Sequence, residues 1–400
     1  MWLDPNETDP KAIEWLNNNV LMGFTEDREK WAGQPYATMN VDGNMTPWFA
    51  TPQYSNGYPG GVPIEAVEKL FEVHVLEGPI FSYIPCDDLD EVMESGGYVD
   101  NENTGFKKVL DPSRKAIIHP VTGQFFNVRK SGYGVHQFDE WLINNVAVLL
   151  DADLEIGSAM LLKEGGVAAV SVELPDTIET KAGFPIRPRL LAYTSHDSTY
   201  QTTYMRSLES PLCDNSLSVE IRRDGNDTQK WTAKHTTAST LRVAEARDAL
   251  TILYQQAEDM TAFVEELAEW EVTNQEFKTL MNQLDPVPEV KLGTGDKQGQ
   301  IINQRAITLA SNRRSEITTL YLKDDRVSPW KGTALGVLQA WNTWDQHERG
   351  VNSAGEVKGK MDGGTIERQM VSTLGGDVAK FDATVLNTLA EICERDKVAV

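Results

Sequence analysis

The segment from Arg114 to Leu217 constrains the fold most, because it reads as strand, strand, helix and then a run of strands. Its first part, "RKAIIHPVTGQFFNVRK", holds two β-type runs joined by a turn at Pro120 to Gly123. A helix is expected next, since four apolar residues fall on one helical face: Phe138, Leu142, Val146 and Leu149. Strands that follow one another through tight turns pair antiparallel. The sequence therefore predicts an α+β core with an antiparallel sheet.

Two further pairs of strands complete this predicted sheet. The runs 155–166 and 167–176 meet at a Gly165-Gly166 turn. The stretch 187–217 then reads as two antiparallel strands followed by a short helix. Its strands carry Thr, Gln, Tyr and Arg where a plain core hairpin carries Val and Ile. This polar and aromatic composition is the feature that the functional interpretation has to explain.

The flanking regions differ from this core. Residues 1–110 are acidic and punctuated by Pro and Gly, which predicts an irregular arm with helices near 9–23 and 64–76. Residues 87–105 are acidic and turn-rich, so we expect them at the surface. Residues 111–240 form the predicted α+β core, and residues 241–400 the predicted helical region.

A long helix opens the helical region near Ser239 and could run unbroken to Leu284. Apolar residues spaced four and three apart form one seam along it: Leu253, Ala257, Met260, Val264 and Leu267. Two interpretations stay open for this seam. It packs across the chain's own sheet, or it contacts another subunit.

The net charge of −23 argues against a protein that coats duplex DNA, because phosphate contacts need clustered Lys and Arg. The charge is uneven along the chain. Residues 1–110 hold 19 acidic against 6 basic residues, whereas residues 111–250 hold 18 against 15. A nucleic-acid surface is therefore expected only in the middle segment.

No catalytic or metal-binding pattern stands out. The six His are scattered, the three Cys lie far apart, and no nucleophile elbow is present, so we predict a non-enzymatic protein without a metal or other cofactor. No apolar run is long enough to cross a bilayer, and "MWLDPNETDP" lacks the features of a signal peptide. We expect a cytoplasmic protein that does not enter a membrane.

The middle segment interleaves basic and aromatic residues. Bases stack on aromatic rings while Lys and Arg follow the phosphate backbone, so this composition predicts a site for single-stranded DNA. The candidate residues are Arg187, Arg189, Tyr193, Tyr200, Tyr204, Arg206, Arg222, Arg223, Lys230, Lys234 and Arg242. The alternative is structural. In that interpretation the tyrosines pack beneath the long helix and the arginines pair with the acidic N-terminal third.

Four ordered blocks resemble the phage/plasmid-like protein family known as domain of unknown function 932. They are "WLNNNVLMGFTEDREKWAG", "LLAYTSHDSTYQTTYMRSLESPLCDNSLSV", "KHTTASTLRVAEARDAL" and "GTALGVLQAWNTWDQHERG". The resemblance implies a phage- or plasmid-borne gene expressed in the cytoplasm of a bacterial host, and it implies no settled activity. The order of hairpin, helix and strands is also similar to the core of single-strand annealing recombinases, a fold-level analogy.

These observations lead to three functional hypotheses. The first is a homo-oligomeric single-stranded DNA-binding or annealing protein that aids recombination or replication. The second is an acidic interaction protein that presents its N-terminal third to a basic host partner and inhibits or redirects it. The third is a virion-associated structural protein.

Overall fold

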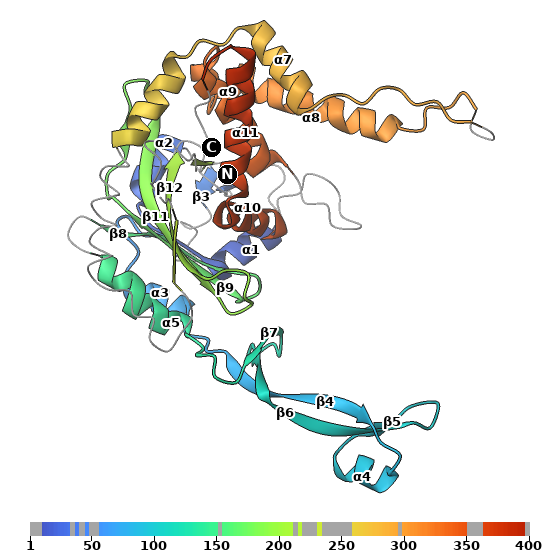
Figure 1. The fold of residues 1–400 in the computed structure, drawn as a ribbon. Coiled ribbons are helices and arrows are strands. Elements are labelled where there is room, and N and C mark those ends of the chain that lie inside the picture. The colour runs from blue at the N-terminus through green and yellow to red at the C-terminus, as the bar shows by residue number, and fades with distance from the viewer. Residues whose placement is uncertain are drawn as a thin grey trace.

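The protein combines antiparallel sheets with a helical C-terminal part, as predicted (Figure 1). The computed structural model describes residues 10–32, 37–39, 45–47, 56–150, 154–210, 215–217, 230–233, 258–294, 298–349 and 363–396. Among these residues, no helix combines the length and the apolar character needed to cross a membrane.

The central sheet is antiparallel throughout. Its strands follow the order β1 (Val20–Met22), β8 (Glu155–Leu162), β9 (Val167–Glu173), β11 (Pro185–Ser195), β12 (Thr202–Ser210) and β13 (Asn215–Leu217). Two short strands attach to it: β10 (Ile178–Glu179) pairs with β11, and β14 (Lys230–Ala233) pairs with β12. Strand β11 is therefore central, and every one of its residues is buried.

Helices cover both faces of this sheet. One face packs its apolar residues on α3 (Ile64–Leu70) and on α5 (Phe138–Trp141), which continues as a π-helical turn (Leu142–Val146) and a 3-10 turn (Ala147–Leu149). The other face packs on α1 (Pro10–Asn19) and α10 (Gly363–Gly375). A strand covered on both faces is buried along its whole length, whatever its sequence alternation.

The helical part forms a second core beside the sheet. Its helices are residues 258–269, α7 (Asn274–Leu284), α8 (Gln304–Lys323), a 3-10 turn (Ser328–Trp330), α9 (Ala334–Thr343), a π-helical turn (Trp344–Glu348), α10 and α11 (Asp377–Ile392). Met260, Val264 and Leu267 are buried in this core together with Phe184 and Ile186, so the seam packs within the chain. Leu253 and Ala257 lie outside the described residues.

Several sequence predictions differ from the structure at element ends. The helix predicted to run unbroken to Leu284 stops at residue 269, because Thr273 begins α7 with a capping box to Glu276. Residues 20–22 leave the first helix and pair with β8 as β1. Residues 215–217, expected as part of a short helix, form β13. The predicted boundary between residues 110 and 111 falls inside a strand, β6 (Gly105–Ile118), and position 240 lies outside the described residues.

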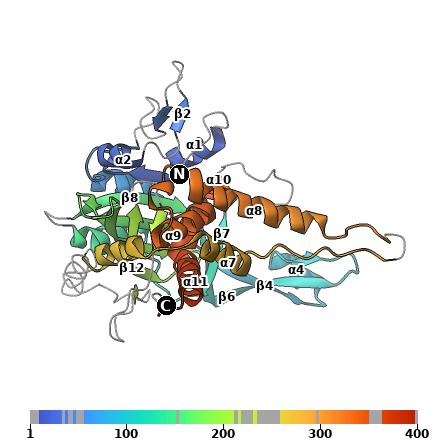
Figure 2. The same cartoon turned by 90° about the horizontal axis from the view of Figure 1, so that it is seen from above.

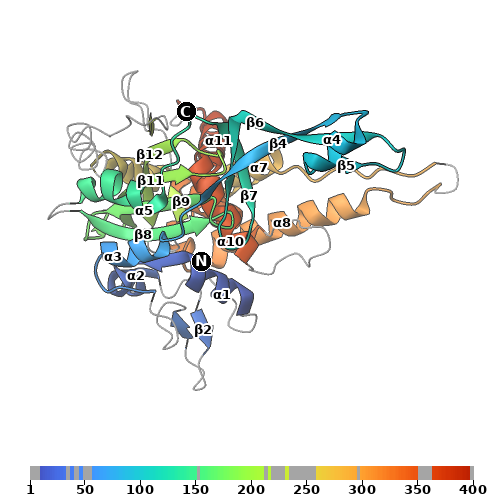
Figure 3. The ribbon, with the colours of Figure 1, turned by 90° about the horizontal axis from the view of Figure 1, so that it is seen from below.

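Two arms project from the same side of the core (Figure 1 and Figure 2). The hairpin arm, residues 76–130, contains β4 (Leu76–Pro85), α4 (Leu89–Glu94), β5 (Tyr98–Val99), β6 and β7 (Phe125–Lys130). The second arm consists of residues 286–294 and 298–312, between α7 and the first half of α8. The short elements α2 (Thr25–Ala32), β2 (Ala37–Met39) and β3 (Met45–Pro47) lie near the N-terminal edge of the sheet (Figure 3).

Candidate functional site

The residues predicted to bind DNA do not share an exposed surface. Arg187, Arg189 and Tyr193 point to one face of β11 and are all buried. Tyr204 on β12 is buried against the opposite layer. Burial of these four side chains corrects the expectation of an exposed polar strand face, because helices cover both sides of this part of the sheet.

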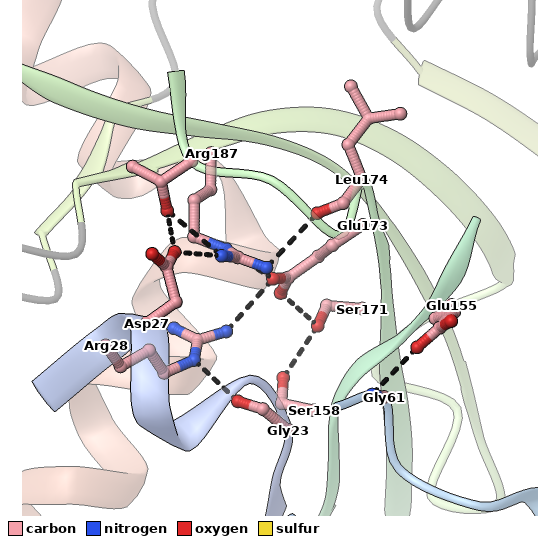
Figure 4. Close-up of polar contacts among 11 residues, drawn as sticks. Gly23, Asp27, Arg28, Gly61, Glu155, Ser158, Ser171, Glu173, Leu174 and Arg187 are labelled. Carbon is pink, nitrogen blue, oxygen red and sulfur yellow. Dashed lines mark hydrogen bonds and ion pairs between the residues drawn. The ribbon is translucent and has the colours of Figure 1, made fainter. Parts of the chain in front are cut away.

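Arg187 belongs to a buried ionic cluster with α2 and β9 (Figure 4). Its guanidinium is 0% exposed, donates from Nη1 to Asp27 Oδ2 at 2.6 Å and from Nε to Glu173 Oε2 at 3.2 Å. It also donates to the carbonyl of Leu174 at 3.1 Å and lies 4.4 Å from the ring centroid of Phe24. The acidic N-terminal third therefore does pair with this arginine, as the structural alternative predicted.

Glu173 is the centre of this ionic cluster. Arg28 Nη2 donates to its Oε2 at 3.0 Å, and Ser171 Oγ donates to its Oε1 at 2.6 Å. Arg28 also fixes the chain locally, since its Nε donates to the carbonyl of Gly23 at 2.9 Å. The carboxylate thus receives charge-assisted hydrogen bonds from two guanidinium groups and a hydroxyl.

The electrostatic surroundings keep Glu173 ionised. Burial alone raises the pKa of its carboxyl group. The guanidinium groups of Arg28, Arg187 and Arg189 outweigh that effect and lower the pKa to about 2. A carboxylate that is held charged, paired and away from solvent fits a structural role, because it has no proton to exchange near neutral pH.

Gly157 makes room for this carboxylate. A Cβ atom at Gly157 would stand 2.0 Å from Glu173 Cδ, far inside van der Waals contact. The register of β8 against β9 shifts at this point, between Ile156 and Ser158. A glycine within a strand often marks such a bulge or a close approach. Gly157 within a mostly apolar strand was therefore the one sequence feature that could have indicated a close approach at the ionic cluster.

The tyrosines pack beneath α10 and α5 rather than beneath residues 258–269. Tyr193 Oη donates to the carbonyl of Leu374 at 2.9 Å, and half-buried Tyr200 donates to that of Val371 at 3.2 Å. Their rings meet edge to face with centroids 5.2 Å apart. Burial raises the pKa of both phenols to about 12 and raises that of Tyr204 further. These hydroxyls anchor helices to the sheet.

The other predicted DNA-binding residues are described only in part. Arg206 and Lys230 lie on β12 and β14, and their side chains lie outside the description. Arg222, Arg223, Lys234 and Arg242 lie outside the described residues.

The hairpin arm is the largest exposed apolar feature of the described residues. Eleven of their 21 exposed large apolar side chains lie in it, which is unusual for a surface that only meets water. They are Leu76, Phe81, Tyr83, Ile84, Leu89, Met93, Tyr98, Val109, Leu110, Val121 and Phe125.

The tip of the arm combines these apolar side chains with negative charge. Residues 85–104 contain seven carboxylates and neither Lys nor Arg. On α4, Leu89 is 51% and Met93 65% exposed, while only Val92 is buried. Asp88 caps α4 by accepting from the N–H groups of Asp90 and Glu91. The tip therefore presents an ordered acidic and apolar surface, which we call the acidic tip, residues 85–104.

An aromatic strip follows one face of the arm below the tip. Tyr98 stacks on Phe106 with centroids 5.1 Å apart and lies 5.3 Å from Tyr83. Lys108 Nζ lies 4.0 Å from the ring centroid of Phe81. Lys107 Nζ pairs with Glu91 at 2.7 Å, and this hydrogen bond lowers the pKa of Glu91. These contacts order the arm although it has little core of its own.

The base of the arm is fastened to the core at two places. The Gln137 side chain accepts from the Val75 N–H at 3.0 Å and donates to the Val75 carbonyl at 3.2 Å, which ties the outgoing and returning chains together. Asn127 Nδ2 donates to the carbonyl of Asp197 at 3.2 Å, and Arg129 bonds to Ser198. The turn at residues 195–198 thus holds the arm.

The acidic tip was predicted at the surface from its sequence, whereas β4 was not predicted. Pro79 and Pro85 in "LEGPIFSYIP" argue against a strand, and the preceding helix was expected to extend to residue 76. The β-branched and aromatic residues Ile80, Phe81, Tyr83 and Ile84 were the signal that could have identified it. The second arm also exposes apolar side chains, those of Val290, Leu292 and Ile302.

Within the described ranges, no group of three or more His, Cys, Asp or Glu side chains is arranged to hold a metal ion. The carboxylates of the ionic cluster are paired with guanidinium groups, and in the acidic tip Glu91 pairs with Lys107 while Asp88 caps α4.

Comparison with known proteins assigns the chain to a family. The family model described as Domain of unknown function (DUF932) matches residues 126–365, more than half of the 400 residues. The chain belongs to the DUF932 family. None of the curated proteins and none of the solved structures matches it, so the similarity to annealing recombinases has no support from a relative. The DUF932 match includes β8 to β12 and α7 to α9, whereas β4, α4, β5 and β6 precede it.

Proposed function

We propose that this DUF932 protein is an interaction protein whose hairpin arm carries the acidic tip to a basic protein of the host. The observation that supports it most is the exposure of Leu89 and Met93 among the carboxylates of α4. Exposed apolar side chains rimmed by charge are typical of protein-binding surfaces. The negative charge steers a basic partner, and the apolar side chains provide the contact that excludes water.

The exposed apolar side chains also favour a protein over DNA as the ligand. Phosphate groups are repelled by the carboxylates that surround Leu89 and Met93, whereas Lys and Arg of a protein are attracted. Binding would inhibit or redirect the partner by occupying the surface on which it recognises other ligands.

Single-stranded DNA binding stays a proposal, and it requires residues other than Arg187, Arg189, Tyr193 and Tyr204, whose side chains are buried. Fluorescence anisotropy with labelled single-stranded and duplex oligonucleotides across a salt series tests it. Absence of binding at low salt, where phosphate contacts are strongest, would end this hypothesis.

Charge reversal at the acidic tip tests the interaction function. We choose Asp87→Lys/Asp90→Lys/Glu94→Lys, and we leave Asp88 and Glu91 intact because they cap α4 and pair with Lys107. The matched control is Glu258→Lys/Glu266→Lys/Glu269→Lys, which changes the net charge equally at exposed positions of helix 258–269. Each variant is used to capture host proteins from a bacterial lysate.

The expected result is a captured basic protein that the tip variant loses and the control variant retains. Capture should also weaken as salt rises, because exposed charges are screened. Equal capture by the wild-type protein and the tip variant would refute the proposal.

A further inference from the structure

The outer edge of β4 carries an inference that is independent of the proposed function. Strand β4 pairs with β6, and β5 and β7 pair with β6 on its other edge. No strand of the described residues pairs with the outer edge of β4. Alternate residues of β4 therefore direct their backbone N–H and C=O groups toward solvent.

The prolines of β4 and its register shift between Pro79 and Ile80 lie toward its ends, so the middle of this edge lacks the usual protection against strand addition. Natural edge strands are kept apart by charged residues, above all Lys, by bulges or by prolines. Glu77 is the only charged residue of β4, and its carboxylate is occupied by Lys115 at 2.6 Å. Prolines stand at positions 79 and 85, and the five residues between them, Ile80–Ile84, are uninterrupted.

The arm also needs another strand for its own stability. Strand β5 pairs with β6 at residues 105–106, and β7 pairs with it at residues 114–118. Between these points β6 pairs with β4 alone, so the middle of the arm is a two-stranded ribbon. Such ribbons are marginal in water, whereas three or more strands with apolar side chains are stable.

We propose that β4 pairs antiparallel with β4 of a second copy of this chain. The contact is isologous and closes as a dimer, since the same strand serves both sides of a two-fold axis. It converts two ribbons into one continuous antiparallel sheet. The exposed side chains of Phe81 and Tyr83 then meet those of the partner strand across the new contact.

Charge selects a second copy and the antiparallel orientation. The acidic tip holds seven carboxylates and no basic residue, whereas the base of the arm, residues 76–79 and 111–130, carries Arg114, Lys115, Arg129 and Lys130 against Glu77 and Asp111. Antiparallel pairing places the negative end of each arm beside the positive end of the other. Parallel pairing would place like charges together, which is unfavourable.

The α4 helix leaves this edge accessible. It packs on β6 and β5, where a Cβ atom on Gly105 would touch Val92 and Leu89, and the Ser95 hydroxyl accepts from the Lys108 N–H at 3.0 Å. It therefore lies on the opposite side of β6 from the open edge of β4. The edge of β4 and the exposed side chains of α4 therefore lie on different sides of the arm.

Ser82→Lys tests the contact without removing an apolar side chain. Ser82 is exposed at the middle of β4, so the substitution leaves the isolated arm intact but brings two like charges together at the two-fold axis. Val121→Lys in the exposed β6–β7 turn is the matched control. Sedimentation equilibrium of the full chain should show a dimer for wild type and control, and association weakened by on the order of fivefold or more for Ser82→Lys.

Cysteine scanning tests the orientation. Single Cys substitutions at Ile80, Phe81, Ser82 and Tyr83 are made in a background that lacks the three native cysteines, Cys86→Ser/Cys213→Ser/Cys393→Ser, and the oxidised products are resolved on a non-reducing gel. In an antiparallel pair, only the residues nearest the two-fold axis lie opposite themselves, so cross-linking should peak at one or two positions. A parallel pair would cross-link equally at all four.

A monomer at every concentration, equal cross-linking along β4, or unchanged association of Ser82→Lys would each overturn the proposal. Circular dichroism verifies that the variants fold. Ser82→Lys leaves all seven carboxylates of the acidic tip in place and should retain host capture while it loses dimerisation, so failure of the dimer and failure of the proposed function are separate results.

Discussion

The ionic cluster at β11 and the hairpin arm reverse the usual placement of charged and apolar residues. In the cluster, Arg28, Glu173 and Arg187 are buried and satisfy one another. In the arm, Phe81, Tyr83 and Met93 face solvent. Buried charges that are fully paired hold elements of one chain in place, whereas exposed apolar side chains are available to another molecule. Exposure and pairing, rather than residue type, therefore separate structural from functional candidates here.

The largest effect is expected from Arg187→Glu/Arg189→Glu. Reversal at Arg187 leaves three carboxylates in contact inside the protein, and removal of one partner of a buried pair alone costs about 3–5 kcal/mol. We expect failure to fold, measured by circular dichroism and by the soluble yield. The exposed reversal Lys130→Glu is the control and should fold normally. A folded double variant that has only lost DNA binding would restore β11 as a DNA site.

Acid should affect the ionic cluster next. The folded-state pKa of Glu173 lies at about 2, below its ordinary value of 4.5. Its contribution to stability is therefore complete above about pH 4.5 and is lost as pH falls toward 2, a change of about 3 kcal/mol. Urea unfolding from pH 7 to pH 3 measures this loss. Glu173→Gln should be less stable at pH 7 and should show a flatter pH dependence, and an unchanged slope would contradict the assignment.

Gly157→Ala tests how tightly β8 lies over the Glu173 carboxylate. The added Cβ would stand 2.0 Å from Glu173 Cδ, so strands or side chain must shift. Overpacking of this kind costs about 1–3 kcal/mol. Chemical denaturation measures the difference from wild type. Gly132→Ala is the control, since its Cβ would meet nothing within 4 Å. Equal stability of the two variants would show that β8 does not pack tightly over the Glu173 carboxylate.

The smallest effect on stability is expected in the arm. Met93→Ser removes an apolar side chain that is 65% exposed, so the free energy of unfolding should change by less than about 0.5 kcal/mol. Host capture should nevertheless decrease, because this side chain is proposed to contact the partner. Thermal unfolding and host capture, measured on the same Met93→Ser preparation, check both expectations. A marked loss of stability with normal capture would show that Met93 has a structural role and does not contact the partner.

Much of the fold could be predicted from the order and periodicity of the sequence. The turn at Pro120 to Gly123 and the strands around Gly165-Gly166 follow from local turn chemistry, which neighbouring residues decide. The C-terminal helices follow from their apolar faces. Element ends were less predictable, since β1 becomes a strand only by pairing with β8, where Val20 lies opposite Met160, 140 residues further along the chain.

The candidate site depended on information that a sequence does not display. Arg187 and Arg189 on a strand predict a basic surface unless the layers that cover the strand are known. The partner of Arg187 in α2, Asp27, is distant in sequence, so only the fold brings the two together. In the arm, the prolines of β4 argued against a strand in the sequence. The segment is nevertheless a strand because it pairs with β6.

The two hydrogen bonds between Gln137 and Val75 hold the two ends of the hairpin arm together, as in an inserted segment. The Gln137 side chain bonds to both backbone groups of Val75, so the chain returns to the core where it left. An excursion with adjacent ends can change in length or sequence without disturbing the scaffold that carries it. The family match begins only at residue 126, near the end of this excursion. A short linker could thus replace the excursion, and foreign recognition loops could be grafted in its place.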